Sequence, residues 1–332
     1  MHYGVIPNER ITEAIALLYA RLPGGMALAE QALGQITKQP DLTEGLLGIW
    51  DEHQVSAVIW ISIDPSGSAT LTSPALHPNG SNTRERETWG AQLISLANHW
   101  QQNRGTTWSQ ALLTHEDSEQ WQRVLSDSGY EQPTKLVYLH LALDSISEEK
   151  KNEGRIEMPS GWSWGRATQL SRHQLLGLVE ETFVDTRDCP FLGAHRTTDE
   201  IVLGFENTGD SKQSHWQILF HDGAPVGCVL GAHHGASALM EWAYVGLIPA
   251  MRRQGRGQWL CQKGLQEADL LNCRTVAMAV DQQNEPALKL YAQFGFEDWD
   301  RREVFIKWDW NQTSSSASTE FVGANFLHVA LF

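Results

Sequence analysis

The chain has 332 residues, a formal net charge of −15 and 41% hydrophobic residues. This length exceeds that of a typical single core, so we expect two domains. The acidic balance disfavours binding to nucleic acid or to an anionic membrane, since both depend on positive surface. No run approaches the roughly 18 apolar residues of a transmembrane helix, and the first residues show no secretory pattern. The cysteines lack C-x-x-C spacing, so we expect a reduced, cytoplasmic protein without a metal site.

The first half of the chain alternates short apolar strands with amphipathic helices. Apolar side chains that cluster on one face predict a helix over residues 11–20. A Pro/Asn/Gly-rich loop is expected at residues 76–85. The other elements predicted in this half are strands at 46–50, 54–63, 69–73, 107–113 and 136–143, and helices at 89–100 and 118–126.

The second half repeats these elements in the same order. Its predicted strands are 216–220, 224–230, 238–247, 275–280 and 304–308, with helices at 258–271 and 285–294. His233 and His234 are assigned to a turn between two of the strands. Gly129-Tyr130 in the first half corresponds to Gly295-Phe296 in the second, which indicates a tandem duplication.

The duplication and the composition together predict the domain limits. A charged run containing glycine and proline at residues 145–161 is typical of a linker. Residues 311–332 read as a low-complexity spacer followed by an apolar tail. We therefore expect one domain at 1–144 and a second at 162–310.

One stretch of the second half carries the clearest chemical signal. An apolar strand begins at Glu241, and Pro249 ends it because proline cannot donate to a sheet ladder. A basic turn with two glycines follows, at the start of a helix whose free N–H groups and dipole favour anions. Such a turn is suited to a phosphate group. Leu260 does not fit a dinucleotide fingerprint, and no Gly-Lys-Ser/Thr follows as in a P-loop.

The basic turn has the form Arg-x-x-Gly-x-Gly and follows Leu-Ile-Pro, which resembles the acetyl-CoA-binding motif of the GNAT superfamily of N-acyltransferases. The segment from Asn284 to Leu290-Tyr291, followed by Gly295-Phe296, is similar to a second pattern of that superfamily. The resemblance implies an α/β (α+β) fold with two tandem GNAT-like domains, each a mixed, mostly antiparallel sheet flanked by helices. The first copy lacks both motifs, an arrangement that resembles the mycothiol synthases, whose substrate is not carried over.

The resemblance also implies the binding residues for acetyl-CoA, the expected co-substrate. Backbone groups of Val245, Gly246 and Leu247 would hold the pantetheine arm and the thioester, and Asn284 would contact the same arm. The pyrophosphate would be bound by Arg252, Arg253, Gln254, Gly255, Arg256 and Gly257. We interpret the degenerate first copy as a domain that packs against the second copy or forms one wall of the substrate site.

The acceptor is expected to be an amine, on a small molecule or a peptide. An alkyl amine has a pKa near 10.4 and must lose a proton before it attacks, so Glu241 is the candidate base, directly or through water. Tyr291 is the candidate acid for the leaving thiolate. The alternatives are a solvated strand-end carboxylate for Glu241 and a core aromatic for Tyr291. Asp188 and Cys189 are expected to line the acceptor site. The competing function is an inactive module that binds CoA or a protein partner.

Overall fold

The structure is a computed structural model that describes residues 1–22, 24–63, 67–78, 83–145, 158–211 and 213–308. Its described part forms two compact units. Unit 1 comprises Met1–Pro133 and the segment that begins at Arg302, and unit 2 comprises Thr134–Arg301. Within these described residues, no helix has the length and apolar character needed to cross a membrane. All four cysteines are free thiols.

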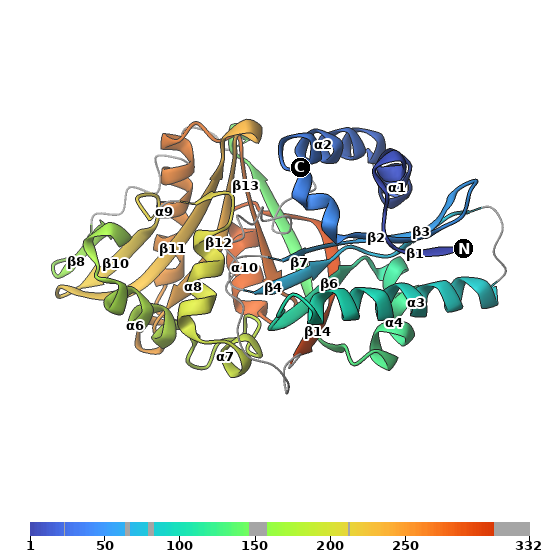
Figure 1. Ribbon diagram of the computed structural model, residues 1–332. Coiled ribbons are helices and arrows are strands. Elements are labelled where there is room, and N and C mark those ends of the chain that lie inside the picture. The colour runs from blue at the N-terminus through green and yellow to red at the C-terminus, as the bar shows by residue number, and fades with distance from the viewer. Residues whose placement is uncertain (23, 64–66, 79–82, 146–157, 212, 309–332) are drawn as a thin grey trace. The chain divides into compact units, whose positions relative to one another are not determined.

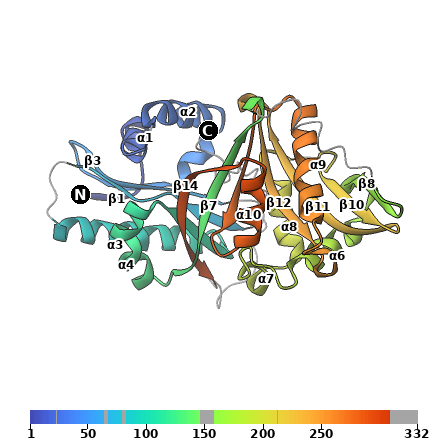
Figure 2. The same ribbon diagram turned by 180° about the vertical axis from the view of Figure 1, so that it is seen from behind.

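Unit 1 is a sheet with helices on both faces. Its strands lie in the order β1 (His2–Val5), β2 (Leu46–Trp50), β3 (Val55–Ile63), β4 (Ser68–Leu71), β6 (Trp108–Leu113) and the end of β14 (Glu297–Trp308), and β5 (Ala75–Leu76) pairs with β3. Figures 1 and 2 show α1 (Ile11–Tyr19) and α2 (Gly25–Lys38) on one face, and α3 (Thr83–Gln102) and α4 (His115–Asp127) on the other. Because both faces are covered, β3 is apolar along most of its length rather than alternating.

Unit 2 has the same architecture. Its strands lie in the order β7 (Glu131–Ala142), β13 (Thr275–Asp281), β12 (Leu239–Leu247), β11 (Ala224–His234), β10 (Gln217–His221) and β8 (Trp162–Arg166), and β9 (Asp210–Ser211) pairs with β11. Its helices are α6 (Arg172–Phe183), α7 (Leu192–His195), α8 (Thr198–Glu206), α9 (Arg256–Leu270) and α10 (Glu285–Gln293). The two opposite views show α6 and α8 on one face of this sheet, and α9 and α10 on the other.

The two units share one topology. Each contains a single parallel pair among the described strands, β4 with β6 in unit 1 and β12 with β13 in unit 2, and antiparallel neighbours surround it. Each unit also completes its sheet with a strand from the other half of the sequence. Residues Glu303–Trp308 pair with β6 in unit 1, and Leu136–Ala142 pair with β13 in unit 2. The shared topology agrees with the tandem arrangement expected from the sequence.

Strand β7 precedes residue 144 but pairs in unit 2, and the end of β14 follows residue 162 but pairs in unit 1. The domain limits expected from the sequence describe the repeats, and a compact unit need not end where a repeat ends. These limits therefore stay a prediction. The expected linker lies mostly outside the described residues, and the expected tail lies wholly outside them.

The predicted strands and helices of both halves are confirmed in type and order, but three begin five or more residues earlier than expected: α3 at Thr83, β7 at Glu131 and β14 at Glu297. Other parts of the prediction were wrong or incomplete. Helices α2, α6, α7 and α8 and strands β1, β5, β8 and β9 were not predicted, and the loop expected at 76–85 ends where α3 begins at Thr83. His233 and His234 lie at the end of β11, and the turn that follows is Gly235–Ser237.

Candidate functional site

The parallel ladder between β12 and β13 is short. It joins Leu239–Glu241 to Thr275–Ala277, and both strands continue beyond it. On the other side of β12, the N–H of Ile248 donates to the carbonyl of Val226 in β11 over 3.0 Å. Successive N–H groups of a strand point to opposite sides, so those of Val245 and Leu247 point away from β11, toward β13. Past Glu241, β12 therefore offers backbone groups beyond the end of its ladder with β13.

A bulge in β12 lies at the point where this ladder ends. Leu230 of β11 is paired with Tyr244, and the next residue, Gly231, is paired with Trp242, which leaves Ala243 as an extra residue. Trp242 and Tyr244 are two residues apart and would share a face in a regular strand. The bulge turns Trp242 toward α9 and Tyr244 toward α6 and α8, so the strand presents large aromatic rings to both layers.

Tyr244 is the centre of an aromatic stack on the α6/α8 face. Its ring stacks on Phe183 at 5.2 Å and on Phe205 at 5.3 Å, and its hydroxyl donates to Thr182 Oγ1 over 2.9 Å. Burial raises the pKa of this phenol. Gly246 makes the arrangement possible, because a Cβ there would lie 2.8 Å from the Tyr244 hydroxyl oxygen. The sequence analysis did not identify this stack; its residues are scattered along the chain and share no local pattern.

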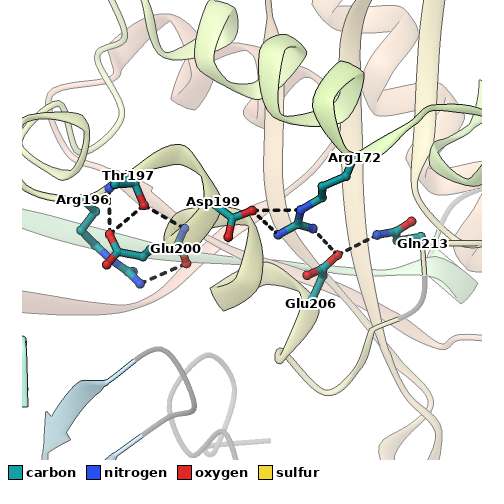
Figure 3. Close-up of polar contacts among 7 residues, drawn as sticks. All are labelled: Arg172, Arg196, Thr197, Asp199, Glu200, Glu206 and Gln213. Atoms are coloured by element: carbon teal, nitrogen blue, oxygen red, sulfur yellow. Dashed lines mark hydrogen bonds and ion pairs between the residues drawn. The ribbon is translucent and has the colours of Figure 1, made fainter. Parts of the chain in front are cut away.

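The stack is covered by α8, which an ionic network attaches to α6 (Figure 3). Arg172 of α6 donates to Asp199 over 2.9 Å and to Glu206 over 2.7 Å, at the two ends of α8. Gln213 donates to the same Glu206 carboxylate over 2.6 Å. At the start of α8, Thr197 forms a capping box with Glu200. These contacts hold Phe205 over the Tyr244 ring.

Glu241, the expected base, is 3% exposed and lies at the last paired position of β12 with β13. Trp242 points to α9, so the preceding Glu241 side chain points to the α6/α8 face. Its Oε2 lies 2.9 Å from Nε2 of His234 on the neighbouring strand. The sequence analysis missed this partner because it assigned His234 to a turn. Gly231 interrupts the apolar run of β11 just before His233 and His234, so no local signal in the sequence extends the strand to them.

Tyr291, the expected acid, lies in α10 and is 6% exposed. Its ring is 6.3 Å from Trp242 and 5.7 Å from Phe296. Burial raises the pKa of its phenol well above the ordinary value, and electrostatic coupling to Cys261, Asp188 and Tyr244 adds to the shift. The phenol therefore stays protonated at neutral pH, within electrostatic reach of groups on both faces of the sheet.

Asp188 and Cys189 lie at the carboxyl end of β13. Asp188 Oδ1 accepts the backbone N–H of Asp281 over 2.9 Å, and the N–H of Cys189 donates to Asp281 Oδ2 over 3.1 Å. Asn284 caps α10 by accepting the N–H of Ala287, and its side chain also hydrogen-bonds Asp188. Burial raises the pKa of Asp188 to about 6 and raises that of the Cys189 thiol well above its ordinary value. Asp188, which is predicted to line the acceptor site, and Asn284, which is predicted to contact the pantetheine arm, are therefore in direct contact.

The basic turn uses one of its arginines for structure. The guanidinium of Arg252 donates to three backbone carbonyls, those of Leu247 at 2.9 Å, Thr182 at 2.8 Å and Asp185 at 3.2 Å. Arg252 thus joins the end of β12 to the end of α6. These bonds occupy donors that the sequence analysis assigned to a pyrophosphate.

The other residues of the turn divide between packing and exposure. The Arg256 guanidinium lies over the rings of Trp162 at 4.5 Å and Trp259 at 4.3 Å. Gly257 allows α9 to approach α10, since a Cβ there would lie 2.9 Å from Leu290 Cδ2. Gly255 has φ +76°, caps α9 and has open space around it, and Arg253 beside it is exposed.

The turn therefore presents Arg253, the backbone around Gly255 and the first N–H groups of α9 to a ligand. Gln254 donates to the carbonyl of Ala250 over 2.7 Å, which fixes the turn from within. Within the part of the chain that the structure describes, no group of three or more His, Cys, Asp or Glu side chains could hold a metal ion.

Comparisons with known proteins point to one family of enzymes. The family model described as "Acetyltransferase (GNAT) family" matches residues 180–296. The mycothiol acetyltransferase of Renibacterium salmoninarum is 24% identical over 192 residues, which cover 55% of this chain and 48% of that protein. The match thus spans about half the length of that relative.

Two solved structures share the fold over most of the chain. A GCN5-related N-acetyltransferase from Sphaerobacter thermophilus has a TM-score of 0.64 at 17% identity, covering 92% of this chain and 95% of that one. A tandem GNAT protein from the clavulanic acid biosynthesis pathway has a TM-score of 0.55 at 14% identity, covering 94% and 98%. At these identities the similarity concerns the fold.

Proposed function

Because residues 180–296 form a domain of the acetyltransferase (GNAT) family, within a tandem GNAT fold, we propose that this chain transfers an acetyl group from acetyl-CoA to an amine. The family uses acetyl-CoA, and the described residues suit that co-substrate. The observation that carries the proposal is the short β12–β13 ladder, followed on β12 by the N–H groups of Val245 and Leu247, directed away from β11, and then by the exposed turn at Gly255.

Acetyl-CoA binding is supported at two points of one continuous segment. The N–H groups of Val245 and Leu247, directed away from β11, suit the amide-rich pantetheine arm. Six to eleven residues further on, Arg253 and the N-terminus of α9 suit the pyrophosphate, since an added Cβ at Gly255 would have no atom within 4 Å. Arg252 and Arg256 support this binding indirectly, by holding the turn on α6 and on two tryptophan rings.

The transfer itself requires a base and an acid. Glu241 would accept a proton from the acceptor ammonium, directly or through water, because a carboxylate at the end of the ladder lies beside the diverging strands. The freed amine would attack the thioester carbonyl and displace the CoA thiolate. Tyr291 would then donate its phenolic proton to that thiolate. Burial raises the pKa of this phenol, so the donation depends on stabilisation of the resulting phenolate within the site.

The acceptor belongs to the class of amines. Asp188 contributes a negative charge near Tyr291 and Tyr244 when it is ionised, which suits a cationic acceptor better than an anionic one. The acceptor of the Renibacterium relative is not carried over, since the match covers only half of that protein. The alternative function, an inactive module that binds CoA, is tested by the experiment that follows.

The experiment is a thiol-release assay with acetyl-CoA and a panel of amines, run on the full chain. We expect amine-dependent release of CoA and a mass increase of one acetyl group on the acceptor. Binding of acetyl-CoA without release for any amine would favour the inactive module. Absence of acetyl-CoA binding, measured by calorimetry, would reject the transferase and the CoA-binding module and leave the protein-interaction module.

A further inference from the structure

The pairing of Glu241 with His234 spans from the interior of unit 2 to its surface. The Glu241 side chain is 3% exposed, whereas the His234 side chain is 26% exposed, and 2.9 Å separates Oε2 from Nε2. The two residues lie on adjacent strands, β12 and β11, with Ala232 paired directly opposite Glu241. His234 is two residues beyond Ala232 and so shares its face. One imidazole therefore connects a buried carboxylate with solvent.

The position of the imidazole is fixed by the neighbouring backbone. Gly209 lies against the ring, and a Cβ there would lie 2.5 Å from Cε1 and 2.8 Å from Nε2 of His234. The chain then continues into β9, whose two residues pair with Ala232 and His233 of β11. In the turn that follows β11, the Ser237 hydroxyl donates to the His234 carbonyl over 3.2 Å. Any side chain at position 209 would displace the ring from Glu241.

We propose that His234 is the proton relay of Glu241, which carries the substrate proton from the buried carboxylate to solvent. This inference rests on the proposed function. The acceptor ammonium transfers one proton to Glu241 and becomes a neutral amine. The proton on Oε2 then passes to Nε2 of His234, and the resulting imidazolium releases one proton to solvent, which returns Glu241 to its ionised form. The O–H bond of Glu241 and the Nδ1–H bond of the imidazolium break, and an Nε2–H bond and an O–H bond to a solvent water form.

Variants can distinguish a histidine with a purely structural role from a histidine that relays protons. Glutamine can donate a hydrogen bond to the Glu241 carboxylate, but it cannot take up a proton and pass it on. His234→Gln would therefore preserve a purely structural role of this position and would abolish a proton relay. His233 is the matched control, because it is adjacent in β11 and its side chain points to the opposite face.

The test measures turnover and the KM for acetyl-CoA of the full chain with an amine that the wild type acetylates. We expect His234→Gln to lower kcat about 100-fold with KM for acetyl-CoA unchanged, and His233→Gln to retain wild-type kcat. In His234→Ala, added imidazole should restore most of the lost turnover. An unchanged kcat in His234→Gln would overturn the relay while the transferase function stands.

Two controls keep the outcome decisive. Thermal unfolding identifies a variant that fails to fold, and His234→Gln decides the question if His234→Ala does so. A wild-type chain that releases no CoA with any amine would instead reject the proposed function, and the relay with it.

Discussion

The Nε of Arg252 donates to the carbonyl of Leu247 over 2.9 Å, and the same guanidinium reaches the carbonyl of Thr182. The first arginine of the basic turn thus fixes the strand that precedes the turn to the end of α6. Thr182 also accepts the Tyr244 hydroxyl through its side chain, so one residue connects the basic turn with the aromatic stack. Arg253 and the N-terminus of α9 remain exposed for a phosphate group.

Arg252→Lys is expected to lower the free energy of unfolding by about 1–3 kcal/mol, because a lysine cannot reach three divergent carbonyls at once. Urea unfolding measures the change. Arg253→Lys is the matched control, and we expect it to change the free energy of unfolding by less than about 0.5 kcal/mol, since Arg253 is exposed. Equal losses in the two variants would contradict the structural assignment of Arg252.

Gly264→Ala is expected to destabilise unit 2 by about 1–3 kcal/mol, because the new Cβ would lie 2.5 Å from the Trp242 indole. Gly177, in the middle of α6, has nothing within 4 Å of an added Cβ. There the same substitution should stabilise the protein by about 0.5–1 kcal/mol, through the better helix propensity of alanine. The opposite signs are measured by urea unfolding. A stable Gly264→Ala variant would mean that the indole does not pack against α9.

Tyr291→Phe is expected to lower kcat about 100-fold while the Kd for acetyl-CoA stays within about twofold. The ring contacts with Trp242 and Phe296 are retained, so only the phenolic hydroxyl group is removed. Thiol release gives kcat, and calorimetry gives Kd. Wild-type turnover would remove Tyr291 from the mechanism, and equal losses in turnover and affinity would assign it to binding.

Asp188→Asn tests the burial of that carboxyl through the pH dependence of stability. The folded pKa is about 6 and the ordinary value is 3.8, so between these values the folded state holds a proton that the unfolded state has released. The ionisation of buried Asp188 therefore lowers the free energy of unfolding as the pH rises from about 4 to about 6, and this loss stays constant at higher pH. Relative to wild type, the variant should gain about 2 kcal/mol of unfolding free energy between about pH 4 and pH 7. A pH-independent difference, measured by urea unfolding, would show that the carboxyl is not desolvated.

The sequence predicted the unit that carries the site because its signals are local. The apolar strand at 238–247, the proline, the glycine turn and the following helix each depend on residues within a few positions of one another. The order of elements in the two halves likewise predicted the shared topology. The exchange of the last strands was not predictable in this way, because β7 and β14 have apolar patterns that fit either sheet.

The roles of individual side chains were less predictable, because they depend on contacts between distant residues. Arg252 resembles a phosphate ligand in the motif, but carbonyls 65–70 residues away in the chain take up its donors. Gly257 resembles a ligand-binding glycine, but its neighbour is Leu290 of α10. The pairing of His234 with Glu241 required the register of β11 and β12, which no periodicity in the sequence supplies.

The most direct test of the account is a calorimetric titration of acetyl-CoA into the full chain, with Arg253→Glu titrated alongside. We expect saturable binding of one acetyl-CoA per chain, weakened at least about tenfold in the variant by the reversed charge beside Gly255. Binding of equal strength in both proteins, or no binding to the wild type, would contradict the assignment of the basic turn to the pyrophosphate of acetyl-CoA.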